Sequence, residues 1–372
     1  MSLTVPAPVS GGPTPLAERA LAPDLARGVM LLFIALANSH VFLRTAPLPE
    51  LGTLDRAVSW ATTTFVDARA FPMFGLLLGY GIARIVARQN GSPKQTRKLL
   101  RRRSLVLLVI GSLHMVLIFD GEILAVYGGL LFLGLWAVNW KDRTLHVVAW
   151  TSLLLIGLVL ALSGSDTGDV DTEAMTLPPD FATQIGERVA FLPLMVLSGW
   201  IMFICPYLVG LWAGRRRVLE QPVHVERLLV RTAVIGIAAA VLGAQPYALL
   251  LLREGTEGSG PELALHQVTG TLGGFGYAAL IALVALHLKE GRVVRALAAT
   301  GQRSMTCYLA QSPVWFVVFT PYLLDFSGRL SITATALLAV TTWLATVLLA
   351  DRLRAAGRRG PFETLTRRLT YR

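Results

Sequence analysis

The sequence predicts an all-α, polytopic integral membrane protein with about ten transmembrane helices and both termini in the cytoplasm. Three observations predict this fold: an apolar composition, a series of bilayer-length apolar segments, and basic residues concentrated in alternate loops. Of the 372 residues, 54% are hydrophobic and 15% are charged, and the mean hydropathy is +0.59. Soluble domains carry about 25% charged residues, and disorder requires low hydrophobicity. The composition therefore excludes both an ordinary soluble enzyme and a disordered chain.

Ten segments have the length and composition of membrane spans, since a helix needs roughly 20 apolar residues to cross the bilayer core. The third and fourth form one hairpin whose turn lies at residues 120–122, at the membrane interface. Glycines four residues apart in the second and eighth spans predict close helix packing. In chain order, the predicted spans are 25–44, 68–87, 104–119, 121–140, 144–163, 190–213, 229–252, 269–288, 305–324 and 331–350.

The spans form a predicted bundle over residues 25–350, with a tail at each end. Residues 1–24 are rich in proline and glycine, which predicts a flexible cytoplasmic tail. Residues 164–187 are acidic and form the longest predicted loop, on the extracytoplasmic side. Residues 351–372 are predicted to be a basic cytoplasmic tail.

The distribution of charge predicts the orientation of the bundle. If the termini and the even-numbered loops share one side, that side holds 27 of the 34 basic residues, and 15 of the 23 acidic residues lie on the other. Basic loops face the cytoplasm in membrane proteins, so we expect a multi-pass protein of the plasma membrane. The net charge of +11 then reflects topology and contact with membrane lipids, and nucleic acid is not expected as a partner.

Polar residues in the first span are the first candidates for a binding site, because polar groups at membrane depth are costly. Arg27 and Asn38 are eleven residues apart and share a helix face, about 16 Å from each other, whereas His40 points elsewhere. Arg27 is placed at the cytoplasmic end, where it either binds a phosphate or extends to the interface. Asn38 either lines a pocket or joins two helices.

The hairpin between the third and fourth spans is the second candidate. His114, Asp120, Glu122 and Tyr127 fall within 14 residues. A carboxylate beside a histidine fixes the tautomer of the ring and makes it a better general base. The alternative is a polar hairpin tip with solvated carboxylates and a histidine bonded between helices.

The ninth predicted span carries a polar stripe. Ser304, Tyr308, Gln311 and Trp315 follow the spacing i, i+4, i+7 and i+11, which places them on one helix face. Such a stripe faces a cavity or a partner helix. The sequence offers no metal site, because its histidines lack metal-ligand spacing and Cys205 and Cys307 lie in separate apolar segments.

Several of these motifs together resemble the YeiB-like family (domain of unknown function 418). In the amino-terminal half they are Asp24–Gly28, Phe71–Gly81 and the hairpin residues from His114 to Tyr127. In the carboxyl-terminal half they are Gly301–Ser312 and the tail from Gly360. The resemblance covers about residues 20–372.

The resemblance implies a layout similar to that of transmembrane acyltransferases, which move an acyl group from cytosolic acyl-CoA to a hydroxyl or amine. Arg27 matches the arginine that type 3 acyltransferases carry in their first span, but Asn38 stands where those enzymes have histidine. A catalytic histidine would then be His114 or His40. Glu122 stands where the YeiB-like family commonly has aspartate.

The leading hypothesis is therefore a transmembrane acyltransferase that uses acyl-CoA as donor and a small-molecule acceptor, without a metal. His114 would be the general base or a transient acyl carrier, oriented by Glu122 or Asp120. Arg27 and Arg303 would bind the CoA phosphates.

Two other classes remain open, together with homo-oligomerisation. The first is a proton-coupled transporter or permease, in which the buried histidine and carboxylates relay protons. The second is a structural or regulatory membrane partner, in which Arg27, His114 and Glu122 could be replaced without effect.

Overall fold

The computed structural model of the chain describes residues 20–43, 50–89, 92–163, 178–254, 260–289 and 291–371. Within these residues all of the assigned secondary structure is helical, as the apolar composition predicts. The α-helices are α1 (Leu21–Ser39), α2 (Thr53–Phe65), α3 (Ala70–Ala87), α4 (Pro93–Leu117), α5 (Leu124–Leu133), α6 (Asp142–Leu162), α7 (Phe181–Arg215), α8 (Glu226–Glu254), α9 (Pro261–His287), α10 (Arg292–Gln302), α11 (Ser304–Phe319), α12 (Ile332–Ala355) and α13 (Pro361–Tyr371).

Seven helical segments in the described part of the chain are long and apolar enough to cross a bilayer, which is typical of a multi-pass membrane protein. A helix lies at each of the ten predicted spans, but α4, α5 and α11 do not meet the same criteria. With 10 residues, α5 is about 15 Å long, half of the bilayer core. α11 has 16 residues, and the first half of α4 is rich in basic residues. The segments are Leu21–Phe42, Thr53–Ala87, Asp142–Leu162, Phe181–Arg215, Pro222–Glu254, Pro261–His287 and Ile332–Ala355.

Three α-helices of the described residues lie outside the predicted spans: α2, α10 and α13. α10 and α13 are short and amphipathic, so a search for long apolar runs does not find them. α13 lies within the predicted basic tail 351–372, and residues 21–24 of the predicted amino-terminal tail are helical in α1. Residues 1–19 of that tail and residues 164–177 of the predicted acidic loop lie outside the described residues.

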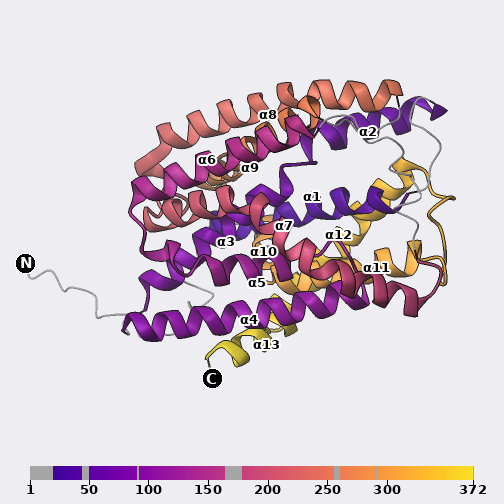
Figure 1. Cartoon of the computed structure of the whole chain (residues 1–372). Coiled ribbons are helices and arrows are strands. Elements are labelled where there is room, and N and C mark those ends of the chain that lie inside the picture. Colours follow the sequence, from indigo (N-terminus) through magenta and orange to yellow (C-terminus); the bar gives the residue numbers. More distant parts are fainter. Residues whose placement is uncertain are drawn as a thin grey trace, which may run out of the picture.

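The long helices run side by side, with α8 along one edge of the bundle and α4 and α13 along the opposite edge (Figure 1). Glycines allow several of these helices to touch backbone to backbone. A Cβ at Gly79 of α3 would meet the backbone of Tyr207 in α7, and one at Gly301 of α10 would meet the carbonyl of Asp24 in α1. The second contact brings the start of α1 against the junction of α10 and α11, which positions the site described below.

A buried arginine holds the break between α2 and α3. Arg69 is fully buried and donates hydrogen bonds to the carbonyls of Thr63 and Ala240. Its guanidinium also lies 3.4 Å from the ring of His266. Because these carbonyls belong to different helices, Arg69 joins the break to α8 and α9 and has a structural role.

Candidate functional site

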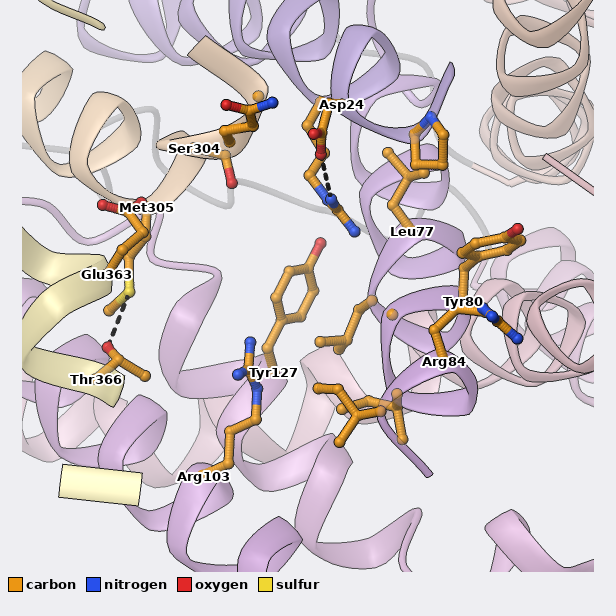
Figure 2. A pocket seen from close by; sticks show the side chains of 18 of the residues that line it. Asp24, Leu77, Tyr80, Arg84, Arg103, Tyr127, Ser304, Met305, Glu363 and Thr366 are labelled. Carbon is orange, nitrogen blue, oxygen red and sulfur yellow. Dashed lines mark hydrogen bonds and ion pairs between the residues drawn. The ribbon is translucent and has the colours of Figure 1, made fainter. Parts of the chain in front are cut away.

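A cavity of about 360 Å³ lies where α1, α3, α4, α5, α11 and α13 meet (Figure 2). Residues from position 20 to position 371 contribute to its wall, so nearly the whole described chain is needed to build it. Its lining includes apolar side chains such as Leu77 and Leu107 together with many charged ones. The charged lining residues are Asp24, Arg27, Arg84, Arg88, Arg103, Glu220, Arg303, Arg359, Glu363 and Arg367.

The charge of the cavity is strongly positive, because seven arginines and three carboxylates line it. Two of the carboxylates are already paired: Asp24 lies 3.2 Å from Arg27, and Glu220 lies 2.7 Å from Arg84. The excess of guanidinium groups in a partly desolvated space favours an anionic ligand. Arginine is well suited to phosphate because its planar donors bind two oxygens at once.

Tyr127 and Tyr308 form the inner wall of the cavity. Tyr127 is 3% exposed and stacks on Phe74, with 6.0 Å between the ring centroids. Its hydroxyl has no hydrogen-bond partner within the described part of the chain. Figure 2 shows this ring pointing into the cavity, toward Asp24 and its ion-pair partner. A buried hydroxyl without a hydrogen-bond partner is energetically costly. A ligand in the cavity that bonds to the Tyr127 hydroxyl would remove this cost.

Behind this wall lies a buried pair, His114 and Glu122. The Nδ1–H group of His114 donates to one carboxylate oxygen of Glu122, and the other oxygen accepts the backbone N–H of Leu124. Both side chains are buried, and neither lines the cavity. The remaining ring nitrogen of His114, Nε2, is buried and has no hydrogen-bond partner among the described residues. With Nδ1–H bonded to the carboxylate, Nε2 is the nitrogen that can accept a proton.

Tyr308 connects the cavity to this pair. It lines the cavity, and its ring centroid lies 5.8 Å from that of His114. Its hydroxyl accepts the backbone N–H of Ile123 at 3.4 Å and donates to the carbonyl of Gly121 at 3.5 Å. Tyr308 therefore holds the hairpin turn next to the cavity and separates the ligand space from His114.

The hairpin is also held from its other end by α7. Arg188 donates to the carbonyl of Met115 at 3.2 Å, and Gln184 donates to that of Leu117 at 3.4 Å. α7 itself begins at a cap formed by Asp180, whose carboxylate accepts the backbone N–H of Thr183 at 3.0 Å. This bond holds the pKa of Asp180 below its usual value. The carbonyls at the end of α4 thus have partners, which fixes the position of His114.

The structure brings together most of the residues that the sequence singles out. Arg27, Tyr127, Arg303, Ser304 and Tyr308 line the cavity, and His114 and Glu122 lie directly behind it.

Three predicted site residues lie elsewhere. Asp120 accepts the N–H of its neighbour Gly121 at 3.1 Å, whereas the hydrogen bond of the His114 ring goes to Glu122. Gln311 donates to the carbonyl of Leu31 at 3.5 Å and joins α11 to α1. Asn38 is buried near the end of α1 and is absent from the cavity wall. Of the two carboxylates considered for orienting the histidine, the geometry selects Glu122.

Arg303 lines the cavity but is already engaged with the backbone. Its guanidinium donates to the carbonyls of Ala299 at 3.2 Å and Arg358 at 2.6 Å. It therefore joins the α10–α11 junction to the segment that leads into α13. The positive charge of Arg303 contributes to the electrostatic potential in the cavity, while its N–H groups hold these two backbone segments together.

The contribution of α13 to the site is not predicted from the sequence. The Glu363 carboxylate accepts hydrogen bonds from the backbone N–H and the hydroxyl of Thr306, at the start of α11. Thr366 contacts the sulfur of Met305 at 3.3 Å (Figure 2). A carboxylate at the first turn of a helix is favourable because it satisfies free N–H groups. Pro361 at the first position of α13, followed by a glutamate, is the helix-start signal that could have revealed this element.

Together these features define a helical membrane protein that has a cationic cavity at one end and a buried histidine–glutamate pair behind it. Residues 213–372 match a family of proteins of unknown function, DUF418. The chain is 27% identical to the uncharacterized protein YeiB of Escherichia coli over 95% of its length and 97% of that protein. It is 26% identical to the uncharacterized protein YxaH of Bacillus subtilis, over 96% of both chains. The carboxyl-terminal part of the chain thus matches DUF418, and nearly the whole chain is similar to YeiB and YxaH.

Similarity also extends to an uncharacterized 39.9 kDa protein of Bacillus acidopullulyticus, at 25% identity over 96% of both chains. The resemblance to the YeiB-like family is thus confirmed along nearly the full length.

Proposed function

We propose that the protein is a transmembrane acyltransferase that moves an acyl group from cytosolic acyl-CoA to a hydroxyl or amine acceptor. The observation that carries this proposal is the adjacency of two features. A cavity with seven arginines, suited to a phosphate-bearing donor, ends at a tyrosine wall. The His114–Glu122 pair, suited to general-base chemistry, lies immediately behind that wall.

The proposal includes an orientation in the plasma membrane. The α4, α5 and α11 helices count as spans in addition to the seven long segments, which makes ten with both termini cytoplasmic. The arginines of the cavity then lie at the cytoplasmic face, in agreement with the preference of basic residues for that side. An acyl-CoA in the cytosol would reach the cavity directly.

In this scheme the reaction needs a proton acceptor beside the thioester. The Nε2 atom of His114 takes the proton from the acceptor hydroxyl or amine, whose oxygen or nitrogen attacks the thioester carbonyl. The new C–O or C–N bond forms as the C–S bond breaks, and the CoA thiolate leaves and takes up the proton. Glu122 keeps His114 in the tautomer that leaves Nε2 free.

The donor would be bound by its phosphates and reach inward with its acyl end. Arg27 and the neighbouring arginines hold the phosphates, with Arg303 contributing its charge. Ser304, Tyr127 and Tyr308 contact the arm. The ring of Tyr308 turns aside when the thioester reaches His114.

The test is transfer of label by the purified full chain, in detergent, from radiolabelled acetyl-CoA or propionyl-CoA to a panel of sugars and amines. General-base catalysis contributes about 10²–10⁴-fold, so His114→Ala is expected to lower transfer by that factor. His224, an exposed histidine of the short 3-10 helix before α8, provides the control, because His224→Ala should leave transfer unchanged. Absence of acyl-CoA binding, or transfer that survives His114→Ala, would reject the proposal.

A proton-coupled transporter is a second candidate, favoured by one observation. The His114–Glu122 pair is buried and closed off from the cavity by Tyr308, as suits a proton relay in a membrane protein. Proteoliposomes distinguish the two functions. Movement of a labelled organic anion that collapses with the proton gradient would favour transport, whereas covalent transfer without such movement would favour the enzyme.

A further inference from the structure

One face of α4 carries a row of exposed apolar side chains that ends in exposed basic ones. Leu105, Val109, Leu113 and Leu117 are each more than 40% exposed and follow one another at intervals of four residues. Side chains at this spacing form a ridge along a helix. In a membrane protein this ridge contacts lipid tails. Toward the start of α4, the same row continues with Arg101, which is exposed.

The start of α4 and the adjoining helix α13 together form a basic patch. α13 packs on α4 (Figure 1). Residues 92–117 contain no acidic residue, and the one acidic residue in 352–371, Glu363, is bonded to Thr306. The patch consists of the exposed residues Lys94, Arg97, Lys98, Arg101 and Arg368.

α13 has two faces with different surroundings. Thr366 and Thr370 are buried on its inner side, and Glu363, Thr366 and Arg367 line the cavity. Leu365 and Leu369, one turn apart, are 41% and 47% exposed on the outer side, beside Arg368 of the patch. A helix with leucines and arginine together on an exposed face is suited to the membrane interface. α13 therefore lies between the cavity and the lipid headgroups.

We propose that anionic phospholipid headgroups bind the basic patch and hold α13 in place as one wall of the cavity. The inference concerns regulation of the site in the proposed function, and it rests on that function only for the identity of the cavity's occupant. Anionic lipids are attracted to clusters of basic residues at the cytoplasmic interface. The headgroups of the lipids whose tails contact Leu105 lie at the level of Arg101.

The lipid is favoured over a soluble partner because the charge and the apolar surface are continuous. The basic patch follows directly from the lipid-facing row of α4 along one helix, and exposed leucines are interleaved with the arginine on α13. A soluble polyanion would use the charges but not the leucines. The headgroup of an inserted lipid uses both.

The inner face of α13 packs on α4 and α11. It is joined to α11 through Glu363 and Thr306, and to the sulfur of Met305 through Thr366. The segment before it includes Gly357, whose φ of +64° is a conformation that glycine adopts without strain and around which a Cβ would meet nothing. Lipid contacts on the outer face would therefore add to the contacts that hold the inner face.

The experiment compares amide hydrogen exchange of residues 361–371 in the full chain, reconstituted in nanodiscs of phosphatidylcholine alone or with 30% phosphatidylglycerol. Exchange is expected to be about tenfold slower with the anionic lipid. The triple variant Arg97→Gln, Arg101→Gln, Arg368→Gln should remove this difference. The variant Arg292→Gln, Arg295→Gln, at exposed positions of α10, loses charge outside the basic patch and should retain it.

Equal exchange in the two kinds of disc would overturn the proposal, as would equal protection of the triple variant. Protection in neutral discs by soluble inorganic phosphate would also overturn it, because phosphate lacks the lipid tail. The measurement requires no acyl-CoA. A protein that shows the lipid effect but no acyl transfer would therefore retain this inference and lose the proposed function.

Discussion

The hairpin that carries His114 and the arginine-lined cavity are neighbours in space but are built in opposite ways. His114 and Glu122 are eight residues apart and meet through a short turn. The cavity draws on residues from position 20 to position 371 and exists only when α1, α10 and α13 are in place. The first region is local, and the second depends on the whole fold.

The two regions depend on their surroundings in different ways. The hairpin pair is supported by its own turn, by Tyr308 and by α7, so its geometry tolerates small shifts of distant helices. The cavity depends on a glycine contact between α1 and α10 and on the attachment of α13. Substitutions at these points should damage the cavity while leaving the hairpin pair formed.

The largest effect is expected when the hairpin pair is broken. Glu122→Ala leaves the imidazole Nδ1–H of His114 and the N–H of Leu124 buried without their acceptor. Losing a buried partner of this kind costs about 3 kcal/mol or more, which thermal unfolding in detergent would measure. Asp120→Ala is the control, since the carboxylate of Asp120 bonds to Gly121 and not to His114, and it should cost only about 1 kcal/mol, the value of one ordinary hydrogen bond. Equal losses for both variants would contradict the assignment of Glu122.

An intermediate effect is expected at the contact between α1 and α10. A Cβ at Gly301 would overlap the backbone of Asp24, so Gly301→Ala should cost about 1–3 kcal/mol by overpacking. Gly186 of α7 has nothing within 4 Å of such a Cβ, and Gly186→Ala should be neutral or stabilising by up to about 1 kcal/mol. Thermal unfolding of both variants checks this. If Gly301→Ala were as stable as the Gly186 variant, the tight contact would be wrong.

The smallest effect is expected where α13 attaches to α11. Glu363→Ala removes the carboxylate that binds the first turn of α11, with a cost of about 1 kcal/mol. Hydrogen exchange of residues 361–371 should become faster, while exchange in the hairpin stays the same. Glu226→Ala, at the exposed start of α8, should affect neither region. Faster exchange in the hairpin as well would mean that the two regions are not independent.

The sequence predicted the helical class and the position of a helix at each proposed span, because long apolar segments in water or lipid satisfy their backbone most readily as helices. It also predicted the meeting of His114 with a nearby carboxylate. It could not choose between Asp120 and Glu122, since that depends on the backbone of one turn. The amphipathic helices α10 and α13 were missed because their apolar faces are too short to be recognised as membrane spans. The helices that they pack on are known only from the tertiary structure.

By itself, the sequence determined which residues are apolar enough to span a membrane, on which loops the basic residues gather, and that His114 has carboxylates within reach, because these properties depend on composition and short spacing. Only the tertiary structure decided that Arg27, Arg84, Arg103 and Arg303 share one cavity and that α13 forms its wall. It also decided that Asn38 and Gln311 are absent from that wall. Helix packing sets these distances, and contacts between backbones such as that of Gly301 with Asp24 are determined by the assembled bundle.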